Sequence, residues 1–211
     1  MIVRQVHVGA PETHEFQGKP VETAFFKYPA GGPVMLRTLG FDGDHQVDRV
    51  HHGGPEKAAL LYPAEHYAHW ERELGRSPGP AAMGENLTVE GLTETTVCIG
   101  DVYQIGQATV EVCQPRVPCY KTAIRHGVPD MAARVAAAGY TGFYVRVLAE
   151  GLVAAGDTIS LVNRPDGAPS VAACTHLLFH DRKNKPAIEA VLESKALAEV
   201  WRVQLRKLLE Q

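Results

Sequence analysis

The sequence lacks the features that mark several large classes of protein. Its 211 residues include only four cysteines, which form neither a CxxC pair nor a dense disulfide framework. No apolar run approaches the roughly 20 residues that a membrane helix needs, and the first residues lack the pattern of a signal peptide. A formal net charge of −3 gives no reason to expect a nucleic-acid polymer or an anionic membrane as a partner. These absences predict a reduced, soluble, cytoplasmic protein.

Common motifs for redox cofactors are missing as well. The sequence has no GxGxxG dinucleotide motif, no P-loop and no cysteine run typical of haem or iron–sulfur proteins. We therefore expect no route within this chain for electrons from NAD(P)H.

What the sequence does contain is a series of short segments with strand character, cut by glycine and proline, over its first 164 residues. Short strands bounded by turn residues favour a barrel-like antiparallel sheet over a βαβ array. Helices are predicted to interrupt the strands at 63–74 and 130–138. The predicted strands are residues 2–8, 23–27, 34–36, 58–62, 87–89, 102–105, 108–113, 143–148 and 158–162.

The composition changes after a Pro-Asp-Gly-Ala-Pro linker at residues 165–169. Ser170 is a predicted helix cap, and helical patterns run to about residue 179, from 186 to about 192, and beyond 194. Helices this short bury little apolar surface alone, so we expect them to pack together against the main domain. The sequence predicts an α+β, mainly β fold. A β-barrel-like domain would cover 1–164 and a small three-helix domain 170–211.

The strongest candidate for a reactive site is the segment 114–121, Gln-Pro-Arg-Val-Pro-Cys-Tyr-Lys. Its prolines should end the preceding strand at Gln114 and stiffen the loop that carries Cys119. The nearby cations Arg116 and Lys121 favour a thiolate, the form that attacks electrophiles or binds metal. The remaining cysteines are predicted to be core or near-core residues: Cys98, Cys113 and Cys174.

A second dense region, residues 42–57, combines aspartates and histidines with a Gly53-Gly54 turn. It fails as a calcium loop, because Val47 stands where glycine is needed and Gly53 where the bidentate glutamate should be. A hydrolytic zinc or manganese site stays open, although no motif such as HExxH supports it. We prefer an anion-binding nest of backbone N–H groups at the glycine turn. The basic side chains around that turn are His51, His52 and Lys57.

Two further patterns each have two interpretations. His66 and His69 are three apart on a predicted helix, as metal ligands often are, but the surrounding glutamates favour a solvated helix face. Asn86 carries a donor and acceptors, so its amide is equally suited to bind the edge of a heterocycle or to satisfy a turn.

Motifs spread over nearly the whole chain agree with one family. They are Gly43-Asp44 with Gln46 and Asp48, His52-Gly53-Gly54-Pro55-Glu56-Lys57-Ala58, Tyr62-Pro63, Glu65-His66-Tyr67, Trp70, Gly84-Glu85-Asn86-Leu87, Gly91-Leu92-Thr93-Glu94, Gly100-Asp101, Gln114-Pro115-Arg116 and Pro118-Cys119-Tyr120-Lys121. In this order they resemble the MOSC domain, the module shared with the C-terminal part of molybdenum-cofactor sulfurases. The tail after Ser170 resembles the three-helix domain of the bacterial YiiM-like branch.

This resemblance implies a β-rich, barrel-like fold with a cleft for molybdenum cofactor. Cys119 takes the place of the family's invariant cysteine, as the catalytic residue and the thiolate ligand of molybdenum. The implied activity is reduction of N-hydroxylated compounds, such as hydroxylaminopurine-type base analogues and amidoximes, with electrons from a separate reductase. The residues then expected to bind the cofactor or its substrate are His52, Gly53, Gly54, Lys57, Asn86, Arg116 and Lys121.

Other functions stay open. In one, Cys119 carries a persulfide in a sulfur-transfer protein for cofactor maturation; in another, the chain is a non-catalytic module that stores or delivers the cofactor. An acyl-transfer enzyme is disfavoured, because it needs a base beside Cys119 and His126 is the only histidine close in sequence. Assembly as a homo-oligomer is also left open.

Overall fold

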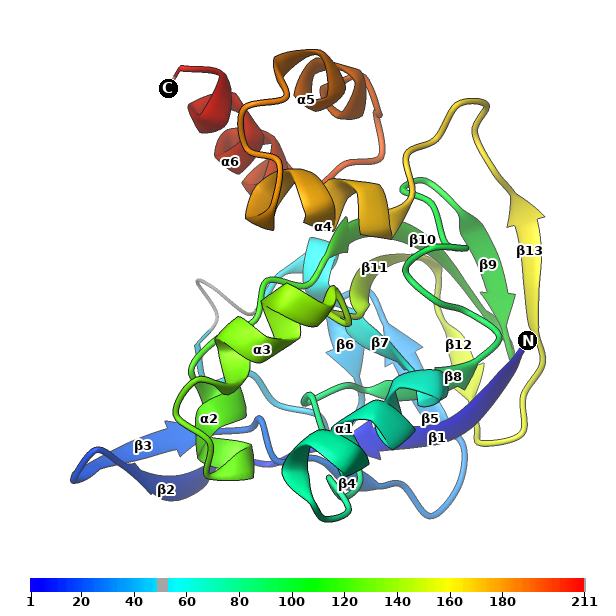
Figure 1. Cartoon of the computed structure of the whole chain (residues 1–211). Coiled ribbons are helices and arrows are strands. Elements are labelled where there is room, and N and C mark those ends of the chain that lie inside the picture. The colour runs from blue at the N-terminus through cyan, green and yellow to red at the C-terminus, as the bar shows by residue number, and fades with distance from the viewer. Residues whose placement is uncertain (49–52, 211) are drawn as a thin grey trace.

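The computed structural model describes residues 1–48 and 53–210, which form a mainly β body with helices on its sides and at one end (Figure 1). The main sheet has eight strands in the order β13-β9-β10-β11-β7-β8-β1-β4. Two smaller sheets have the orders β12-β5-β6 and β2-β3. The strands are β1 (Ile2–Val8), β2 (Glu12–Phe16), β3 (Lys19–Thr23), β4 (Tyr28–Pro29), β5 (Val34–Arg37), β6 (Gly40–Phe41), β7 (Ala59–Pro63), β8 (Leu87–Glu90), β9 (Val102–Ile105), β10 (Ala108–Pro115), β11 (Phe143–Ala149), β12 (Gly151–Val153) and β13 (Ile159–Asn163).

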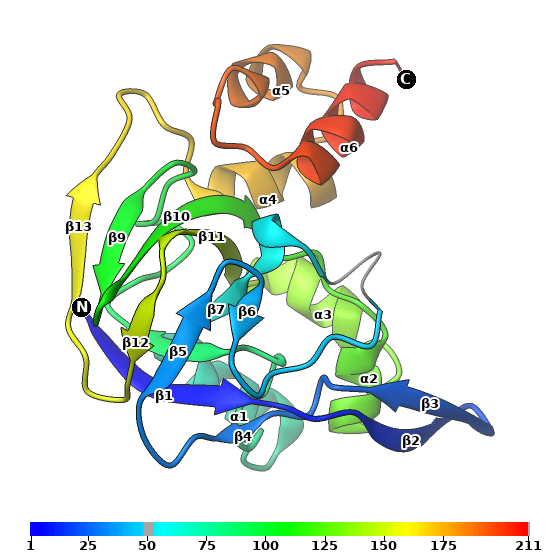
Figure 2. The ribbon, with the colours of Figure 1, turned by 180° about the vertical axis from the view of Figure 1, so that it is seen from behind.

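The helices fall into two groups, which meet where α3 lies next to α4 (Figure 2). One group lies beside the sheet, and the other forms the C-terminal end of the chain. The first group is α1 (Tyr67–Leu74), α2 (Lys121–His126) and α3 (Met131–Ala138), with short 3-10 turns at Pro55–Lys57 and Ala64–His66. The second group is α4 (Val171–Phe179), α5 (Lys185–Leu192) and α6 (Glu199–Leu209).

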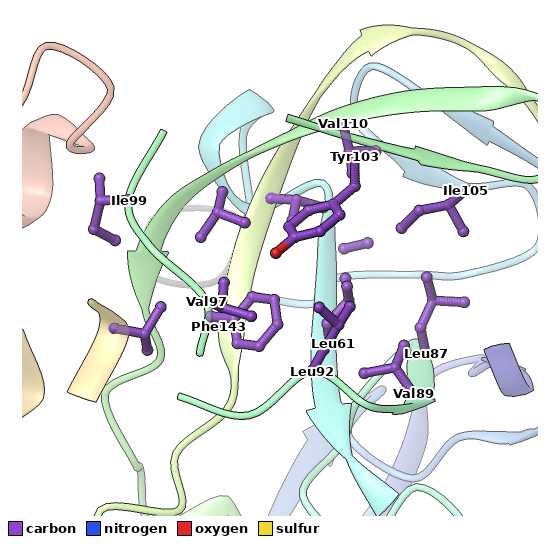
Figure 3. Packing of buried hydrophobic residues seen from close by; sticks show 14 of the residues in the cluster. Leu61, Leu87, Val89, Leu92, Val97, Ile99, Tyr103, Ile105, Val110 and Phe143 are labelled. Atoms are coloured by element: carbon purple, nitrogen blue, oxygen red, sulfur yellow. The ribbon is translucent and has the colours of Figure 1, made fainter. Parts of the chain in front are cut away.

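Strand β10 shows why these residues form a half-buried strand. Ala108, Val110 and Val112 are buried on one face, while Thr109 and Glu111 between them are partly exposed. This period of two matches the alternation of side chains along a strand. The buried face contributes to a cluster that also contains Leu61 of β7, Leu87 of β8 and Phe143 of β11 (Figure 3).

The sheet is not wholly antiparallel, which corrects the prediction. Strands β7 and β8 are parallel, with Leu61 opposite Leu87, and the crossover between them contains α1. All five residues of β7 are buried, as is usual for strands covered on both faces. The molecule therefore contains one β–α–β unit within an otherwise antiparallel sheet.

Beyond its ladders, the sheet has further contacts between β1 and the segment that leads into β13. An isolated bridge pairs Ile2 of β1 with Thr158, the residue before β13. Backbone hydrogen bonds flank it, from the Val3 N–H to the Asp157 carbonyl and from the Ile159 N–H to the Met1 carbonyl, each 2.9 Å long. Because β1 and β13 form no continuous ladder, a closed barrel is not established and the barrel-like description stays a prediction.

The C-terminal helices share one apolar core with the sheet, as expected from their small size. Leu177 of α4, Ile188 of α5 and Trp201 of α6 belong to the same buried cluster as the strand residues. Ser170 caps α4, since its hydroxyl accepts a hydrogen bond from the backbone N–H of Ala173 at 3.0 Å. The Ala198 N–H donates to the carbonyl of Cys113 at 2.9 Å, which fixes the start of α6 at the end of β10.

Two local predictions were wrong, and one helix was missed. Residues 24–27 are not a strand, because β3 ends at Thr23 and β4 begins at Tyr28. The short helix α2, directly after Cys119, was not predicted. The solvated helix face proposed for His66 is also wrong: His66 is buried, and its Nε2 lies 2.6 Å from the Glu94 carboxylate.

Within the described part of the chain, no helix is both long and apolar enough to cross a membrane.

Candidate functional site

Cys119 lies in the short connection between β10 and α2. Strand β10 runs to Pro115, one residue beyond its predicted end. The Cys119 carbonyl accepts bonds from the N–H of Thr122 at 3.1 Å and from the Thr122 hydroxyl at 2.8 Å. The backbone of Cys119 is thus fixed by the first turn of α2, while its side chain is partly exposed.

The Cys119 side chain lines a pocket that spans about 570 Å³, its open mouth included. Segments far apart in sequence form its walls: the 23–27 segment, the 44–48 loop, the 83–86 segment and the Cys119 loop. Cationic side chains are concentrated in this lining, a composition suited to an anionic ligand. They are Lys27, Lys57, Arg116 and Lys121.

Arg116 and Lys121 are buried cations of this pocket. Arg116 is only 3% exposed, and its Nη2 donates a long hydrogen bond of 3.4 Å to the Met83 carbonyl. Its Nη1 has no hydrogen-bond partner among the described residues. Lys121 is 8% exposed and likewise makes no ion pair or hydrogen bond with the described part of the chain. Buried charges are costly without partners, so these two groups are suited to receive an anion.

A third cation, Lys27, is neutralised by a buried network. Its ammonium forms an ion pair with the Asp44 carboxylate, whose other oxygen accepts a hydrogen bond from the Asn86 amide at 2.8 Å. Burial lowers the pKa of Lys27, although the neighbouring Asp44 charge acts in the opposite direction. Lys27 and Asp44 both line the pocket.

The Asn86 amide is occupied by internal contacts. Its Oδ1 accepts from the N–H of Leu60 at 3.2 Å, and its Nδ2 donates to Asp44. Asn86 therefore lies in the pocket wall, where its side chain ties β7 to the 44–48 loop. Its role in binding a heterocycle stays a prediction.

Lys57 and Tyr144 also line this cavity. Burial lowers the pKa of Lys57, because the charged ammonium loses hydration in the pocket wall. Burial also raises the pKa of Tyr144 to about 12, so its phenol is neutral and can donate at neutral pH. Within the described residues, the Tyr144 hydroxyl has no hydrogen-bond partner.

Helix α2 is bonded to the 80–82 segment, which leads into the pocket wall at 83–86. His126 lies within hydrogen-bond distance of the Ala82 carbonyl, 2.7 Å from its Nε2, and Arg125 donates to the Pro80 carbonyl at 2.7 Å. His126 is buried and is not among the residues that line the pocket with Cys119, so its ring is not placed as a base beside that thiol. The acyl-transfer interpretation has no further support.

A second pocket meets the first one at four shared lining residues, Asp48, Lys57, Cys119 and Tyr144. It lies between the Cys119 loop and α6, spans about 1120 Å³ with its mouth, and has a more apolar lining. Its wall residues include Val117, Pro118 and Tyr120 on the loop, and Val200, Trp201 and Gln204 on α6. The C-terminal helices thus reach the neighbourhood of Cys119.

The predicted site residues are distributed unevenly over this geometry. Lys57, Asn86, Arg116, Cys119 and Lys121 all line the first pocket. The described glycines Gly53 and Gly54 are not among its lining residues, and His52, like His51, lies outside the described residues. No group of three or more His, Cys, Asp or Glu side chains that could hold a metal occurs in 1–48 and 53–210.

Lys27, Asp44 and Tyr144 were not identified as site residues from the sequence. Gly43-Asp44 belongs to the motif pattern, and Lys27 follows the apolar run Ala24-Phe25-Phe26, where a buried charge needs a partner. Tyr144 gave no such signal, because a tyrosine within a strand is more often a packing residue.

Comparison with known proteins identifies two matching family models. Residues 48–160 match the MOSC domain, and residues 169–211 match the YiiM-like, 3-alpha helix domain. The Bacillus subtilis protein YflK is 49% identical over 97% of this chain and 93% of its own length. Protein YiiM of Escherichia coli is 34% identical over 90% of this chain and 85% of its own length.

Solved structures agree in fold and extent. The crystal structure of YiiM from Geobacillus stearothermophilus has a TM-score of 0.84 at 37% identity, with 98% of each chain covered. YiiM from Escherichia coli has a TM-score of 0.78 at 30% identity, covering 100% of this chain and 94% of that one. A Gibberella moniliformis protein named "Reductase" is 35% identical over 78% of this chain, but this match covers only 30% of that protein.

Proposed function

Because the chain belongs to the MOSC domain proteins with a YiiM-like three-helix domain, we propose that it binds molybdenum cofactor at Cys119 and reduces N-hydroxylated compounds. MOSC domains are associated with molybdenum cofactor. The fungal relative named "Reductase" is consistent with an oxidoreductase role. Hydroxylaminopurine-type bases and amidoximes are the proposed substrates.

The observation that carries this proposal is the buried, unpartnered Nη1 of Arg116 in the same pocket as Cys119. An orphaned guanidinium N–H needs an acceptor, and the dithiolene and phosphate groups of the cofactor are anionic. Lys121 and Lys57 add positive charge in the same lining. The residues present therefore fit a thiolate-ligated, anionic cofactor.

Each pocket residue has a separate role in the proposed function. Cys119 supplies a soft thiolate ligand, a suitable donor for molybdenum. Arg116 and Lys121 bind the anionic parts of the cofactor, while the Lys27–Asp44–Asn86 network holds the pocket wall in place. Tyr144 presents a neutral hydroxyl as a hydrogen-bond donor. When bound, the cofactor supplies the two-electron chemistry.

The overall reaction balances with an external electron source. An N-hydroxylated compound, two electrons and two protons give the amine or amidine and one water, with the N–O bond broken. The sequence has no flavin, haem or iron–sulfur motif, so we propose a separate reductase as the electron donor.

The test compares wild type, Cys119→Ser and Cys98→Ser, each expressed in a host that makes molybdenum cofactor. Benzamidoxime and a chemical reductant are supplied, and benzamidine is measured by chromatography. Cys98 is the matched control, since it is another partly exposed thiol that lines neither pocket. We expect wild type and Cys98→Ser to form benzamidine, and Cys119→Ser to lose at least 100-fold in rate.

The alternative functions give different results in the same preparations. Full activity of Cys119→Ser would refute the assignment of Cys119. Sulfane sulfur on Cys119 without molybdenum would favour sulfur transfer. Bound cofactor without turnover would favour storage or delivery.

A further inference from the structure

The second pocket differs in chemistry from the cationic pocket that it adjoins. Away from the residues that line both pockets, it is mostly apolar, with two glutamines. Its lining there is Val117, Pro118 and Tyr120 of the Cys119 loop, Val200 and Trp201 of α6, and Gln114 and Gln204. Val117, Tyr120 and Val200 are exposed although apolar or aromatic. Apolar surface that is gathered into a pocket, with few polar groups, is typical of a site for a small organic ligand.

The shape of this wall is fixed by hydrogen bonds on both sides. The Trp201 indole Nε1 donates to the Pro115 carbonyl at 2.9 Å, so the ring is held against the base of the Cys119 loop. The Gln114 amide donates to the Glu56 carbonyl at 2.8 Å. The apolar wall is therefore preformed, which reduces the entropy lost when a ligand binds.

The polar residues of this lining are Asp48, Lys57, Gln114, Tyr144 and Gln204, and the side chains of the last two are available to a ligand. The Gln204 amide, on the α6 side, makes no hydrogen bond to any described residue, and a glutamine amide can bind an adenine edge with two hydrogen bonds. At the junction, the Tyr144 hydroxyl is also unpartnered in the described ranges and lies in both linings, as Cys119 does. A ligand with a flat ring and a polar substituent fits this arrangement.

We propose that the pocket between the Cys119 loop and α6 binds the ring of the substrate, a flat, uncharged aromatic heterocycle, with its N–OH group directed toward Cys119 and Tyr144. The inference rests on the proposed function and adds that the C-terminal domain forms part of the substrate site. The cationic pocket is then left for the anionic cofactor. Val200 and Gln204 of α6 become residues that determine specificity.

The experiment uses adenine, the amine formed when 6-hydroxylaminopurine is reduced, as the binding probe. Adenine is titrated into the full-length protein by calorimetry, for wild type, Val200→Arg and Val203→Arg. The two valines lie on the same helix and are 40% and 41% exposed, but only Val200 lines the pocket. The expected result is a Kd raised at least tenfold in Val200→Arg and unchanged in Val203→Arg.

Gln204→Leu is a second variant that removes the polar contact without adding bulk, and it should raise the Kd by about fivefold to tenfold. Equal Kd values in all four proteins would overturn the proposal, and so would the absence of adenine binding by wild type at millimolar concentration. Thermal melts confirm that the variants are folded.

The molybdenum content separates this proposal from the proposed function. Val200→Arg should retain as much molybdenum as wild type, because Val200 does not line the cationic pocket. If Val200→Arg loses adenine binding but wild type contains no molybdenum, the heterocycle site is supported and the proposed function is rejected.

Discussion

The indole Nε1 of Trp201 donates a hydrogen bond to the Pro115 carbonyl at 2.9 Å, linking helix α6 to the residue four positions before Cys119. Trp201 is buried in the core shared by the sheet and the C-terminal helices. Glu56 makes a second link, since its carboxylate accepts from the N–H of Glu199 at 3.1 Å at the start of α6. The three-helix domain thus supports the loop that carries Cys119.

Replacement of Trp201 by Phe tests this support. The variant loses the indole N–H, so the buried Pro115 carbonyl has no donor there, and the side chain fills less volume. We therefore expect the free energy of unfolding to fall by about 1–3 kcal/mol. Urea denaturation measures the change. An unaltered denaturation midpoint would show that the hydrogen bond contributes nothing to stability.

Gly84 in the pocket wall should not tolerate a side chain. Its φ is +77°, and an added Cβ would approach the Phe25 ring to 2.7 Å. We expect Gly84→Ala to cost about 2–4 kcal/mol, from the backbone conformation and the clash together. Gly75→Ala is the control, because Gly75 has a φ of +65° but an added Cβ there would meet no heavy atom within 4 Å. Equal losses in unfolding experiments would mean that the Phe25 contact is harmless.

His7 makes stability depend on pH below neutrality. Burial, with smaller contributions from Lys27 and Arg125, lowers the pKa of His7 from 6.5 to about 4. Between pH 6.5 and about pH 4 the unfolded chain therefore binds this proton more readily than the folded state does. The folded state loses stability as the pH falls through this range. At pH 5 the loss from this residue relative to pH 7 should be about 2 kcal/mol.

The measurement is the free energy of unfolding at pH 7 and pH 5 for wild type, His7→Gln and His176→Gln. The loss on acidification should shrink in His7→Gln and persist in His176→Gln, whose imidazole is exposed in the wild type. Burial also lowers the pKa of His126, so a part of the loss remains in every variant. Identical losses in His7→Gln and wild type would contradict the assignment.

Most strands were predictable, because alternation and bounding turns act locally. Residues 102–105 and 108–113 follow this pattern, and the structure has strands there. The parallel pairing of β7 with β8 was missed, since two short apolar runs contain no information on their relative direction. The helix α2 was missed because it is only six residues long, too short for a periodic pattern.

The site was predictable where charge and proline mark the sequence. The 114–121 segment indicated Cys119, Arg116 and Lys121, and all three line the same pocket. The contributions of Lys27, Tyr144 and α6 depend on tertiary packing that joins segments distant in sequence. Pairing of Lys27 with Asp44 across 17 positions cannot be derived from either neighbourhood alone.

The most direct test of the central claim is the molybdenum content of the purified protein. Wild type, Cys119→Ala and Cys98→Ala are expressed in a host shown to load a control molybdoenzyme, and the metal is measured by mass spectrometry. We predict near-stoichiometric molybdenum in wild type and Cys98→Ala, and its loss in Cys119→Ala. Equal molybdenum in all three proteins, or none in wild type, would contradict the claim.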